Sequence, residues 1–363
     1  METKPAFRTN FRRKLLQWYR KHKRDLPWRR RRDPYAIWVS EVMLQQTQVV
    51  TVIPYYDRFL SCFPNLRALA EAPEEAVLAQ WSGLGYYRRA KLLHRGAQTV
   101  LQQHDGRMPE SAEALRELPG IGPYTAGAIA SIAFGHAEPL VDGNVVRVLS
   151  RIFRRRGHAK EGRLQKEIWA LAAELIDPGS AGDFNQGLME LGATLCRVVL
   201  PSCGRCPVAE LCAAAQSGDP EDFPETPPAQ KTLRLTRSVA VALRGEAVLL
   251  LKPKISRWFQ GMWSLPQEYV AEGIEASGLL QEALKARLGL QFEPKEALPS
   301  TAHGVTHHRI TSLAWKGPVS GRLKTSAEYE EARFFEAHEL ATLALPNLDR
   351  KVLNAAQIAP GAA

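Results

Sequence analysis

Cysteine is scarce in this chain: only 5 of its 363 residues are Cys, and four of the five fall in one short run. A disulfide-dense scaffold is therefore excluded, and a chain of this length buries enough apolar surface to fold without covalent cross-links. Long apolar runs are also missing, since no stretch approaches the roughly 20 residues that a membrane helix needs. The N-terminal residues lack the apolar segment of a secretory signal, so we expect a cytoplasmic protein in a reducing compartment.

Acidic residues are nearly absent from the first 32 residues, which contain thirteen lysines and arginines but only Glu2 and Asp25 as acids. This segment accounts for the formal net charge of +10, and residues 147–156 carry a second group of arginines. Clustered cations of this kind suit a polyanion such as nucleic acid. A solvated, solubilising surface would have the same composition, so charge alone leaves both interpretations open.

The first two thirds of the chain have helical periodicity. Between Ser40 and Leu60, apolar residues recur at three- and four-residue intervals, which predicts one amphipathic helix over this range. We therefore expect a mainly helical region over residues 7–215. Further helices are predicted at residues 111–118, 124–134, 145–153 and 164–176.

A change of composition marks the end of the helical region. Residues 216–231 contain four prolines and almost no apolar side chains, which predicts a linker. After it, two apolar runs flank Arg244, Gly245 and Glu246, as in a β-hairpin. A helix-like run at 278–290 and strand-like runs at 310–316 and 332–337 follow. Residues 232–358 are therefore predicted to form a separate α+β domain.

The clustered cysteines are Cys196, Cys203, Cys206 and Cys212, separated by six, two and five residues. Four thiolates can hold a zinc ion or an iron–sulfur cluster. Zinc sites usually pair their cysteines in two close turns, whereas only one of these gaps is short, so the spacing favours the larger cluster. A structural zinc knot is the alternative. The fifth cysteine, Cys62, stands alone between apolar residues and is predicted to pack in the core.

A glycine-containing turn joins two of the predicted helices. Gly120 and Gly122 allow a tight corner after Pro119, and Pro123 suits the first position of the following helix. The amides at the start of that helix would point outward and bind a phosphate group. The segment resembles the helix–hairpin–helix of DNA repair enzymes, although a corner between two helices often needs such a turn for packing alone.

Two carboxylates and a tyrosine are candidates for chemistry on DNA: Glu41, Asp142 and Tyr124. Removing a base requires an acid that protonates the leaving group and a carboxylate that stabilises the positive sugar left behind. Apolar neighbours would raise the pKa of Glu41, and a helix N-terminus would keep Asp142 ionised. The purely structural interpretation is that Glu41 is a first-turn helix acid and Asp142 a helix N-cap.

Six motifs and the cysteine run follow one another as in the adenine-specific mismatch DNA glycosylases, the MutY family of the endonuclease III superfamily. The chain resembles this family over essentially its whole length. The fold implied is an all-α helix–hairpin–helix region with an iron–sulfur loop at residues 196–212, followed by an α+β, Nudix-like domain. The motifs are LPWR (26–29), PYAIWVSEVMLQQTQV (34–49), GLGYYRRA (83–90), LPGIGPYTAGAI (118–129), VDGNVVRV (141–148) and FNQGLMELGA (184–193). The stretch RWFQGMWSLPQE (257–268) resembles the GLWxFP segment of the Nudix-like C-terminal domains attached to this family.

The resemblance implies roles for particular residues. Glu41 is the acid that protonates adenine, Asp142 stabilises or traps the oxocarbenium sugar, and Tyr124 and Asn144 support them. Without the resemblance, Gln46 would be interpreted as a solvent-facing helix residue and Tyr86 as a core aromatic. The resemblance also implies that the four clustered cysteines ligate a 4Fe–4S cluster. The residues implied to bind DNA or the lesion are Gln46, Thr47, Leu84, Tyr86, Glu190, Gly120, Gly122, Thr306 and His307.

The C-terminal domain departs from its implied relatives in two places. The helix at 278–290 lacks the dense acidic pattern that holds Mg²⁺ in Nudix hydrolases, so we do not expect nucleotide hydrolysis. Val305, Thr306 and His307 stand where the family has a Phe-Ser-His loop, so the strength of 8-oxoguanine discrimination does not follow from the sequence. An ordinary polar loop is the alternative interpretation of these histidines.

The predicted function is that of a monofunctional adenine DNA glycosylase. The substrate would be double-stranded DNA with adenine opposite 8-oxoguanine or guanine, and the protein would act as a monomer at a bacterial nucleoid. Tyr124 occupies the position where related pyrimidine-lesion enzymes carry a lysine that forms a Schiff base and cuts the strand. The alternatives are an endonuclease III-like glycosylase and lyase, a non-catalytic iron–sulfur DNA-binding protein, and a Nudix hydrolase.

Overall fold

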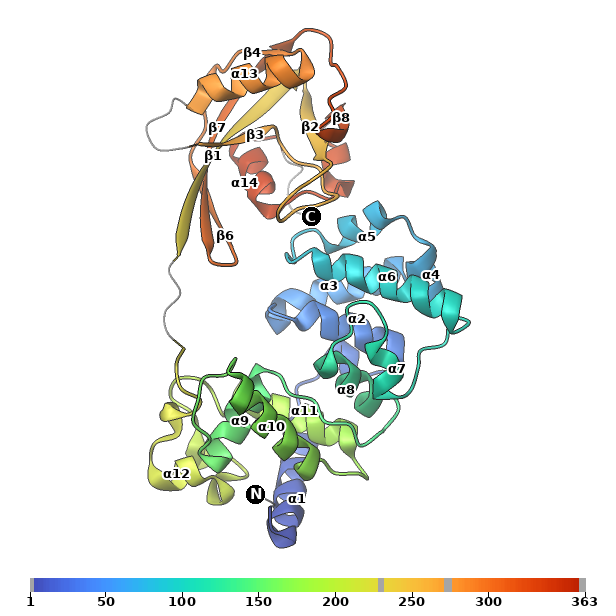
Figure 1. Cartoon of the computed structure of the whole chain (residues 1–363), viewed down its shortest axis with the longest axis vertical. Helices are drawn as coiled ribbons and strands as arrows, with labels where there is room; N and C mark the ends of the chain where they lie inside the picture. Colours follow the sequence, from blue (N-terminus) through green and yellow to red (C-terminus); the bar gives the residue numbers. More distant parts are fainter. Residues whose placement is uncertain (1–2, 228–231, 271–275, 359–363) are drawn as a thin grey trace. The chain divides into compact units, whose positions relative to one another are not determined.

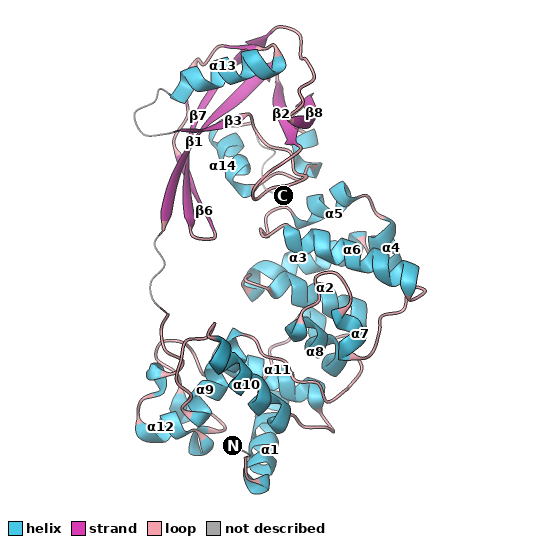
Figure 2. Cartoon of the chain, in the orientation of Figure 1, coloured by secondary structure: helices cyan, strands magenta, loops and turns pink. Residues whose placement is uncertain are grey.

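The computed structural model describes residues 3–227, 232–270 and 276–358. The chain forms two compact units, one from residues 1–71 and 92–228 and the other from residues 72–91 and 229–363. Figure 1 labels the elements in chain order. Figure 2 shows that the strands of the described chain all lie in the second unit, whereas the first is built from helices and loops. The predicted fold class, a helical region followed by an α+β domain, is confirmed.

The first unit contains long helices joined by short 3₁₀ turns. The unit boundary at residues 91 and 92 falls inside α6. The 3₁₀ turns are η1 (Pro27–Arg29), η2 (Cys203–Arg205), η3 (Ala209–Leu211) and η4 (Pro220–Asp222). The helices are α1 (Pro5–His22), α2 (Pro34–Leu44), α3 (Val49–Cys62), α4 (Leu66–Glu71), α6 (Arg88–Gln103), α7 (Ala112–Arg116), α8 (Pro123–Ile132), α9 (Gly143–Phe153), α10 (Gly162–Leu175), α11 (Ala181–Thr194) and α12 (Ala213–Ser217).

The prediction of a single helix over residues 40–60 is wrong, because two helices occupy this range. Helix α2 ends at Leu44, α3 begins at Val49, and Gln46 between them adopts a left-handed φ of 58°. The apolar periodicity continues across the break, so it did not reveal the turn, whereas the polar run at residues 45–48 marks it. The helices predicted at 111–118, 124–134, 145–153 and 164–176 are confirmed as α7, α8, α9 and α10.

Helix α2 is the central helix of the first unit. Pro34 starts it, and the Asp33 side chain caps it by accepting hydrogen bonds from two backbone amides at 3.2 Å. Every residue from Tyr35 to Met43 is buried, so the helix has no solvent-facing side. A helix that is buried all round carries any ionisable residue into the interior. In this way α2 delivers Glu41 to the inside of the protein.

Helix α11 links the parts of the first unit, since it packs against α1, α8 and α9. One hydrophobic core joins Phe11 of α1, Leu149 of α9 and Phe184 of α11. Helices α9 and α11 approach very closely where Gly192 faces Asn144, because a Cβ atom on Gly192 would lie 2.6 Å from the Asn144 Cβ. This close approach places the start of α9 beside the C-terminal end of α11.

The second unit is built on an eight-stranded mixed sheet. Its main path has the order β4-β7-β1-β2-β8, with β3 paired to β1 and with β5 and β6 paired to β7. Strands β1 and β7 run parallel, while the other described pairs are antiparallel. The strands are β1 (Leu233–Arg244), β2 (Ala247–Pro253), β3 (Gln267–Val270), β4 (Gln291–Phe292), β5 (Glu296–Ala297), β6 (Thr301–Val305), β7 (His308–Ser320) and β8 (Tyr329–Phe335).

Helices cover both faces of this sheet. Val239 and Val241 of β1 share a core with α14 (Asn347–Ala355), whereas Ala240 and Ala242 share a core with α13 (Ala276–Leu288). Successive side chains of a strand point to opposite faces, so β1 serves both cores at once. The predicted hairpin is confirmed, since Arg244 pairs with Ala247.

The two units do not follow the predicted domain boundaries at every point. Helix α5 (Glu74–Trp81) and the turn after it belong to the second unit. Within the predicted linker, Phe223 is buried in the core of the first unit, and its carbonyl accepts a hydrogen bond from Arg151 Nε at 2.9 Å. Residues 228–231 of that linker lie outside the described residues. In the described parts of the chain, no helix is long and apolar enough to span a membrane.

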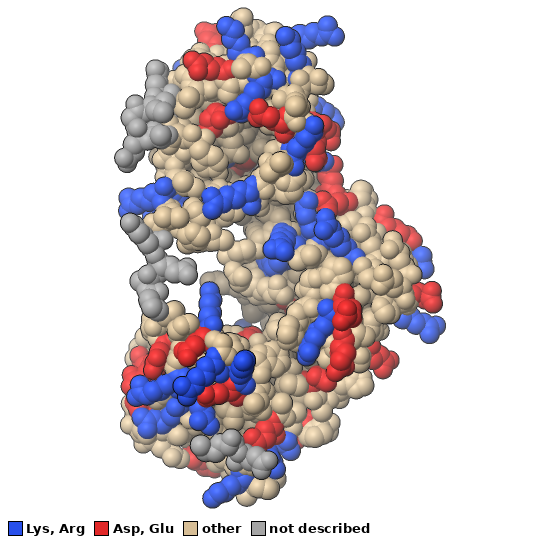
Figure 3. Space-filling view, viewed as in Figure 1, with Lys and Arg blue, Asp and Glu red and all other residues tan. Residues whose placement is uncertain are grey.

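Many of the N-terminal cations are engaged by acidic side chains of the same unit. Arg8 contacts Glu174 at 3.0 Å, and Lys14 contacts Glu210 at 3.0 Å. Arg20, Arg24, Arg29 and Arg30 are also ion-paired. Part of the basic N-terminal segment therefore serves folding rather than presenting a polyanion-binding arm. In Figure 3, Lys and Arg also gather over the part of the first unit that carries α9 and α12.

Candidate active site and cysteine cluster

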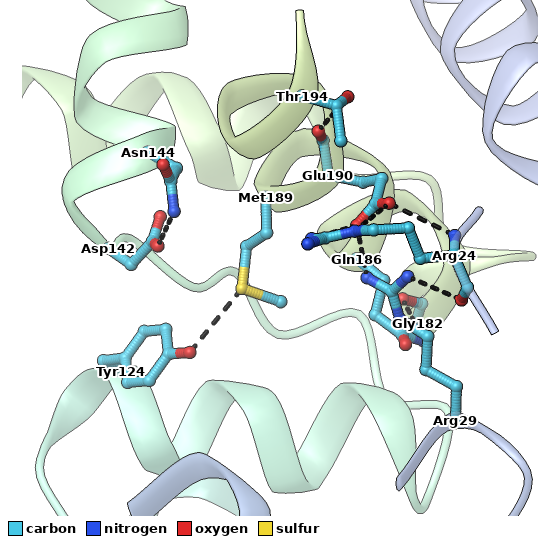
Figure 4. A network of polar contacts seen from close by, with 10 residues as sticks. All are labelled: Arg24, Arg29, Tyr124, Asp142, Asn144, Gly182, Gln186, Met189, Glu190 and Thr194. Atoms are coloured by element: carbon cyan, nitrogen blue, oxygen red, sulfur yellow. Dashed lines mark hydrogen bonds and ion pairs between the residues drawn. The ribbon is translucent and has the colours of Figure 1, made fainter. Parts of the chain in front are cut away.

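A cavity of about 180 Å³ in the first unit brings together all four predicted catalytic residues. Glu41 enters it from α2, Tyr124 from α8, Asp142 and Asn144 from the start of α9, and Glu190 from α11. Thr47, from the turn between α2 and α3, also lines it. Figure 4 shows Tyr124, Asp142, Asn144 and Glu190 around Met189. Residues separated by up to about 150 positions in the sequence therefore meet in one small chamber.

Glu41 is a buried carboxyl group with one hydroxyl partner. Its residue is 4% exposed, and the Tyr124 hydroxyl donates a hydrogen bond to its Oε2 atom. Burial raises the pKa of Glu41 to about 7, against the opposing effect of that hydrogen bond. Because an acid with a pKa near the working pH transfers a proton most effectively, this carboxyl group is suited to general acid catalysis.

Tyr124 lies in the first turn of α8, directly after the helix–hairpin–helix turn. Besides its bond to Glu41, its hydroxyl lies 3.5 Å from the Met189 sulfur. Burial, followed by the nearby Glu41 charge, raises the pKa of Tyr124 well above its ordinary value. The hydroxyl therefore stays protonated and acts as a donor to Glu41.

Asp142 caps helix α9. Its Oδ1 atom accepts a hydrogen bond from the Val145 amide at 2.7 Å, and its Oδ2 atom accepts one from Asn144 Nδ2 at 2.7 Å. The structural interpretation as an N-cap is thus confirmed, and the same carboxylate lines the cavity. Burial raises the pKa of Asp142, and these hydrogen bonds oppose the rise only in part. The hydrogen bonds at the helix start favour the ionised form, as expected, while desolvation opposes it and is the larger effect.

Arginines on α9 connect the cavity to the cysteine run. Arg147 donates to the Asn144 side-chain oxygen at 2.8 Å and to the Cys196 carbonyl at 2.8 Å. Arg151, which is 2% exposed, donates to the Arg197 carbonyl at 2.7 Å and lies 3.3 Å from the Cys196 sulfur. From the sequence, the clustering of these arginines indicated only that they belong to a basic surface. In the structure they organise the loop between α11 and η2.

Glu190 is held by two arginines that the sequence did not single out as site residues. Arg24 donates to Oε1 at 2.7 Å and to Oε2 at 2.9 Å, and Arg29 donates to Oε2 at 2.8 Å. Burial on its own would raise the pKa of Glu190, but the two guanidinium groups outweigh it and lower the pKa to about 2. Figure 4 shows both arginines converging on this carboxylate. The Arg in the LPWR motif was the only sequence signal for this arrangement.

The helix–hairpin–helix turn has the predicted form. Gly120 has a left-handed φ of 80°, and a Cβ atom there would lie 2.7 Å from the Leu92 Cβ, so only glycine fits. Gly122 has an ordinary φ of −90° and open space around it, and it precedes α8 without a side-chain cap. Pro123 occupies the first helical position, as predicted. The amides at the start of α8 therefore have no side-chain cap from Gly122 and can face a phosphate.

The other predicted lesion residues lie outside this cavity. Gln46 is exposed in the turn after α2, in neither a helix nor the core. Leu84 and Tyr86 belong to the second unit, where Leu84 is buried and Tyr86 is 45% exposed. The core interpretation of Tyr86 is therefore wrong. Thr306 and His307 are exposed at the turn between β6 and β7, where Thr306 has a left-handed φ of 53°.

The four clustered cysteines line one small, mainly apolar pocket. Among the residues that the structure describes, no three His, Cys, Asp or Glu side chains converge on a single metal-ion position. Burial raises the pKa of Cys206 to about 12, so the apolar pocket does not by itself favour the thiolate. Four sulfur donors facing one pocket fit a group that is ligated by four cysteines. Cys62 is exposed at the end of α3, so its predicted place in the core is wrong.

Comparisons with known proteins agree with this geometry. Residues 39–174 match the family of HhH-GPD superfamily base excision DNA repair proteins. The adenine DNA glycosylase of Homo sapiens is 36% identical over 405 residues, which cover 96% of this chain and 74% of that protein. A solved thermostable thymine-DNA glycosylase is 32% identical with a TM-score of 0.53, covering 58% of this chain and 98% of that one. A MutT protein from Methanosarcina mazei Go1, 18% identical with a TM-score of 0.32, covers 35% of this chain and 94% of that one.

The fold and the cavity thus define a helix–hairpin–helix base excision DNA repair protein. Within that class, the human relative matches nearly the whole chain. The chain belongs to the adenine DNA glycosylase family.

Proposed function

We propose that this protein excises adenine from double-stranded DNA in which the adenine lies opposite 8-oxoguanine or guanine. The observation that carries the proposal is a pair of carboxyl groups, the buried Glu41 and the partly buried Asp142, in one cavity behind a helix–hairpin–helix turn. A base inside a duplex cannot reach a buried acid, so the adenine must flip out of the stack to enter the cavity. Membership of the adenine DNA glycosylase family supports the choice of base.

In the proposed mechanism, Glu41 donates its proton to the leaving adenine. The raised pKa supports this role, because an ordinary glutamate would be almost fully ionised at neutral pH. As the glycosidic bond breaks, positive charge develops on the sugar, and the Asp142 carboxylate stabilises it. Asn144 holds Asp142 in place through its side-chain amide. Glu41, now ionised, accepts a proton from the water that completes hydrolysis.

Base removal by water, without strand cleavage, follows from the residue after the hairpin. A bifunctional enzyme needs an amine that attacks the sugar and forms a Schiff base. Tyr124 offers a hydroxyl that is already hydrogen-bonded to Glu41 and whose pKa is well above its ordinary value. A non-catalytic DNA-binding protein would have no need of an acid with a pKa of about 7 in a cavity. These two observations support the monofunctional glycosylase over its alternatives.

Glu190 with Arg24 and Arg29 forms a fixed polar wall of the proposed adenine pocket. Because each carboxylate oxygen already accepts a charged hydrogen bond, this group is not available as an acid or a base. We assign it to shaping the pocket and to orienting the base.

Cys196, Cys203, Cys206 and Cys212 would hold a 4Fe–4S cluster. Bound there, the cluster would cross-link the loop at 196–212 and fix its shape. Arg147 and Arg151 hold the first part of that loop through the Cys196 and Arg197 carbonyls. An iron assay together with the absorbance spectrum of purified protein distinguishes this cluster from the zinc alternative.

Recognition of the lesion pair is assigned to two sets of exposed residues. Gln46 and Thr47 of the first unit and Leu84 and Tyr86 of the second would contact the lesion pair, where Gln46 and Tyr86 would wedge the duplex. Thr306 and His307 of the second unit would contact the opposite base, where the Thr306 hydroxyl offers a hydrogen bond. Action as a monomer and at the nucleoid of a bacterium remain predictions.

Single-turnover excision on three duplexes tests the proposed function. The duplexes carry adenine opposite 8-oxoguanine, adenine opposite guanine, and an oxidised pyrimidine, and each product is analysed with and without alkali. We expect abasic sites at adenine that break only after alkali. Direct strand cleavage at the oxidised pyrimidine, with adenine left intact, would overturn the assignment in favour of an endonuclease III-like enzyme.

A further inference from the structure

The turn at residues 82–86 has an unusual backbone. Gly83 and Gly85 have left-handed φ angles of 107° and 74°, and Tyr86 also adopts a positive φ of 49°. A tyrosine rarely occupies this region, and it stays there only where surrounding contacts hold it. Its ring is 45% exposed although its neighbours Leu84 and Tyr87 are buried. The turn thus presents one aromatic side chain outward from a closely held backbone.

Local contacts hold the tip of this turn. Arg89 donates to the Gly85 carbonyl at 3.1 Å, and Trp81 Nε1 donates to the same carbonyl at 3.2 Å. The Arg89 guanidinium lies 5.5 Å from the Tyr86 ring centroid and 5.4 Å from that of Trp81. Arg89 is itself only 9% exposed. These contacts set the shape of the tip but do not determine where it stands.

Side chains of the C-terminal part of the same unit hold the base of the turn. Asn347 Nδ2, at the start of α14, donates to the Gly83 carbonyl at 3.0 Å. Arg350 Nε, one turn further along α14, donates to the Ser82 hydroxyl at 3.2 Å. That hydroxyl donates in turn to the Leu345 carbonyl at 3.0 Å, and Ser82 is 9% exposed. Three hydrogen bonds therefore join two consecutive residues of the turn to the segment from Leu345 to Arg350.

A second attachment lies at the preceding helix, α5. Trp263 Nε1 donates to Glu75 Oε1 at 2.7 Å, and Lys252 Nζ lies 3.5 Å from the other oxygen of that carboxylate. Both ends of the segment that leads to Tyr86 are thus held by residues far along the chain. This arrangement explains why residues 72–91 form one compact unit with the C-terminal domain.

We propose that Asn347 and Arg350 are positioning residues for Tyr86, so that the C-terminal domain sets the wedge that opens the duplex as well as contacting the opposite base. The inference rests on the proposed function, which assigns Tyr86 to the lesion pair. It adds a task for α14, whose residues do not belong to the cavity that contains Glu41. Neither residue stands out in the sequence, because Asn347 and Arg350 are ordinary polar residues of a C-terminal helix.

Single-turnover excision by Asn347→Ala is the first test, with Asn354→Ala as the matched control, because Asn354 is exposed on the same helix. We expect Asn347→Ala to slow excision of adenine opposite 8-oxoguanine about fivefold to tenfold, the factor that one lost hydrogen bond produces. The control should stay within twofold of wild type. The pH dependence of the rate should not move in either variant, because the Glu41 environment is intact.

A double-mutant cycle with Tyr86→Ala separates positioning from a general structural defect. If Asn347 acts through Tyr86, then Asn347→Ala should change the rate of the Tyr86→Ala protein by less than twofold. Additive losses would overturn the inference, as would an Asn347→Ala rate equal to that of the control. A wild-type protein that does not excise adenine would instead overturn the proposed function.

Ser82→Ala removes the neighbouring contacts of the turn with Arg350 and Leu345, and it provides an independent variant should Asn347→Ala reduce folding. We expect a loss of about fivefold that is again absent in the Tyr86→Ala background. As a rescue, Arg350→Lys, which keeps a donor near the Ser82 hydroxyl, should retain more activity than Arg350→Met. Equal rates for these two variants would show that the bond from Arg350 to Ser82 does not position the turn.

Discussion

Glu41 and Glu190 line the same cavity and are both buried, yet their pKa values lie on opposite sides of the ordinary value for glutamate. Glu41 accepts a hydrogen bond from the neutral Tyr124 hydroxyl, and its pKa is raised to about 7. Glu190 accepts hydrogen bonds from Arg24 and Arg29, and its pKa is lowered to about 2. The same cavity therefore contains a carboxyl group that is protonated in part near neutral pH and a carboxylate that stays ionised between two arginines.

A third buried carboxylate shows how many arginine partners are needed to lower the pKa of a buried carboxyl group. Asp349 in the second unit is ion-paired with Arg237 at 2.7 Å, and both side chains are almost fully buried. Burial nevertheless raises the pKa of Asp349, because a single guanidinium does not compensate for the loss of water. Glu190 has two such partners, and its pKa falls. The comparison teaches that the identity and number of donors, rather than burial alone, decide whether a buried carboxyl group is an acid or an anion.

The largest effect is expected for Glu41→Gln, which keeps the shape of the side chain but removes its proton-donating carboxyl group. Excision in single turnover should fall about 10²- to 10⁴-fold, the range for loss of a general acid. Affinity for a duplex with adenine opposite 8-oxoguanine should stay within a few-fold of wild type. Glu113→Gln, an exposed glutamate of α7, is the matched control. Retained activity in Glu41→Gln would contradict the assigned role.

Glu190→Gln should destabilise the protein by about 3 kcal/mol, because it leaves two guanidinium groups without their buried anion. The pKa of Glu190 is depressed, so its stabilising contribution is present above the ordinary glutamate pKa of about 4.5 and is lost as pH falls toward about 2. Thermal unfolding at pH 7 and at pH 3 measures this. We expect the variant and wild type to differ less at pH 3 than at pH 7. An equal difference at both values would mean that Glu190 is not ionised by its partners.

Tyr124→Phe should move the pH dependence of excision, because it removes the hydrogen bond that lowers the pKa of Glu41. In the proposed mechanism the active form of Glu41 is protonated, so the wild-type rate should fall as pH rises through about 7. Without the Tyr124 hydroxyl, burial acts unopposed by that bond, and the midpoint should move to higher pH. A series of single-turnover rates from pH 5.5 to 9 checks the direction. A midpoint that moves to lower pH would show that the hydroxyl stabilises the protonated carboxyl group instead.

The smallest shift in the pH midpoint of excision is expected for Arg29→Met. Arg29 lowers the pKa of Glu41 through its charge, after the larger influences of burial, Tyr124 and Asp142. Removing it should raise the midpoint by less than Tyr124→Phe does, while leaving Glu190 with one guanidinium, the situation of Asp349. Arg30→Met, a neighbouring arginine that pairs with Asp25 on the surface, is the control and should not move the midpoint. Equal shifts in both arginine variants would indicate a general effect of net charge.

Local patterns predicted the parts of the site that depend on a few neighbouring residues. Pro123 at the first position of α8 and Asp142 as the cap of α9 are both in place. The apolar residues around Glu41 predicted a raised pKa, and the structure agrees. The break between α2 and α3 was missed, because its apolar periodicity passes through the turn that contains Gln46. The proline and cap signals depend on interactions within about four residues of the chain, so they can be recognised in the sequence itself.

Only the tertiary structure decided how distant charges and segments combine. In the sequence, Arg24 and Arg29 are two members of a basic N-terminal segment. In the structure, α11 packs so that Glu190, about 160 residues away in the sequence, accepts hydrogen bonds from both. In the same way, hydrogen bonds from Asn347 and Arg350 assign the turn at Tyr86 to the C-terminal unit. By itself, the sequence determined the order of the two regions, the family motifs, the apolar surroundings of Glu41 and the four-cysteine run. It did not determine which charges neutralise one another, because that depends on distances between segments that only folding sets.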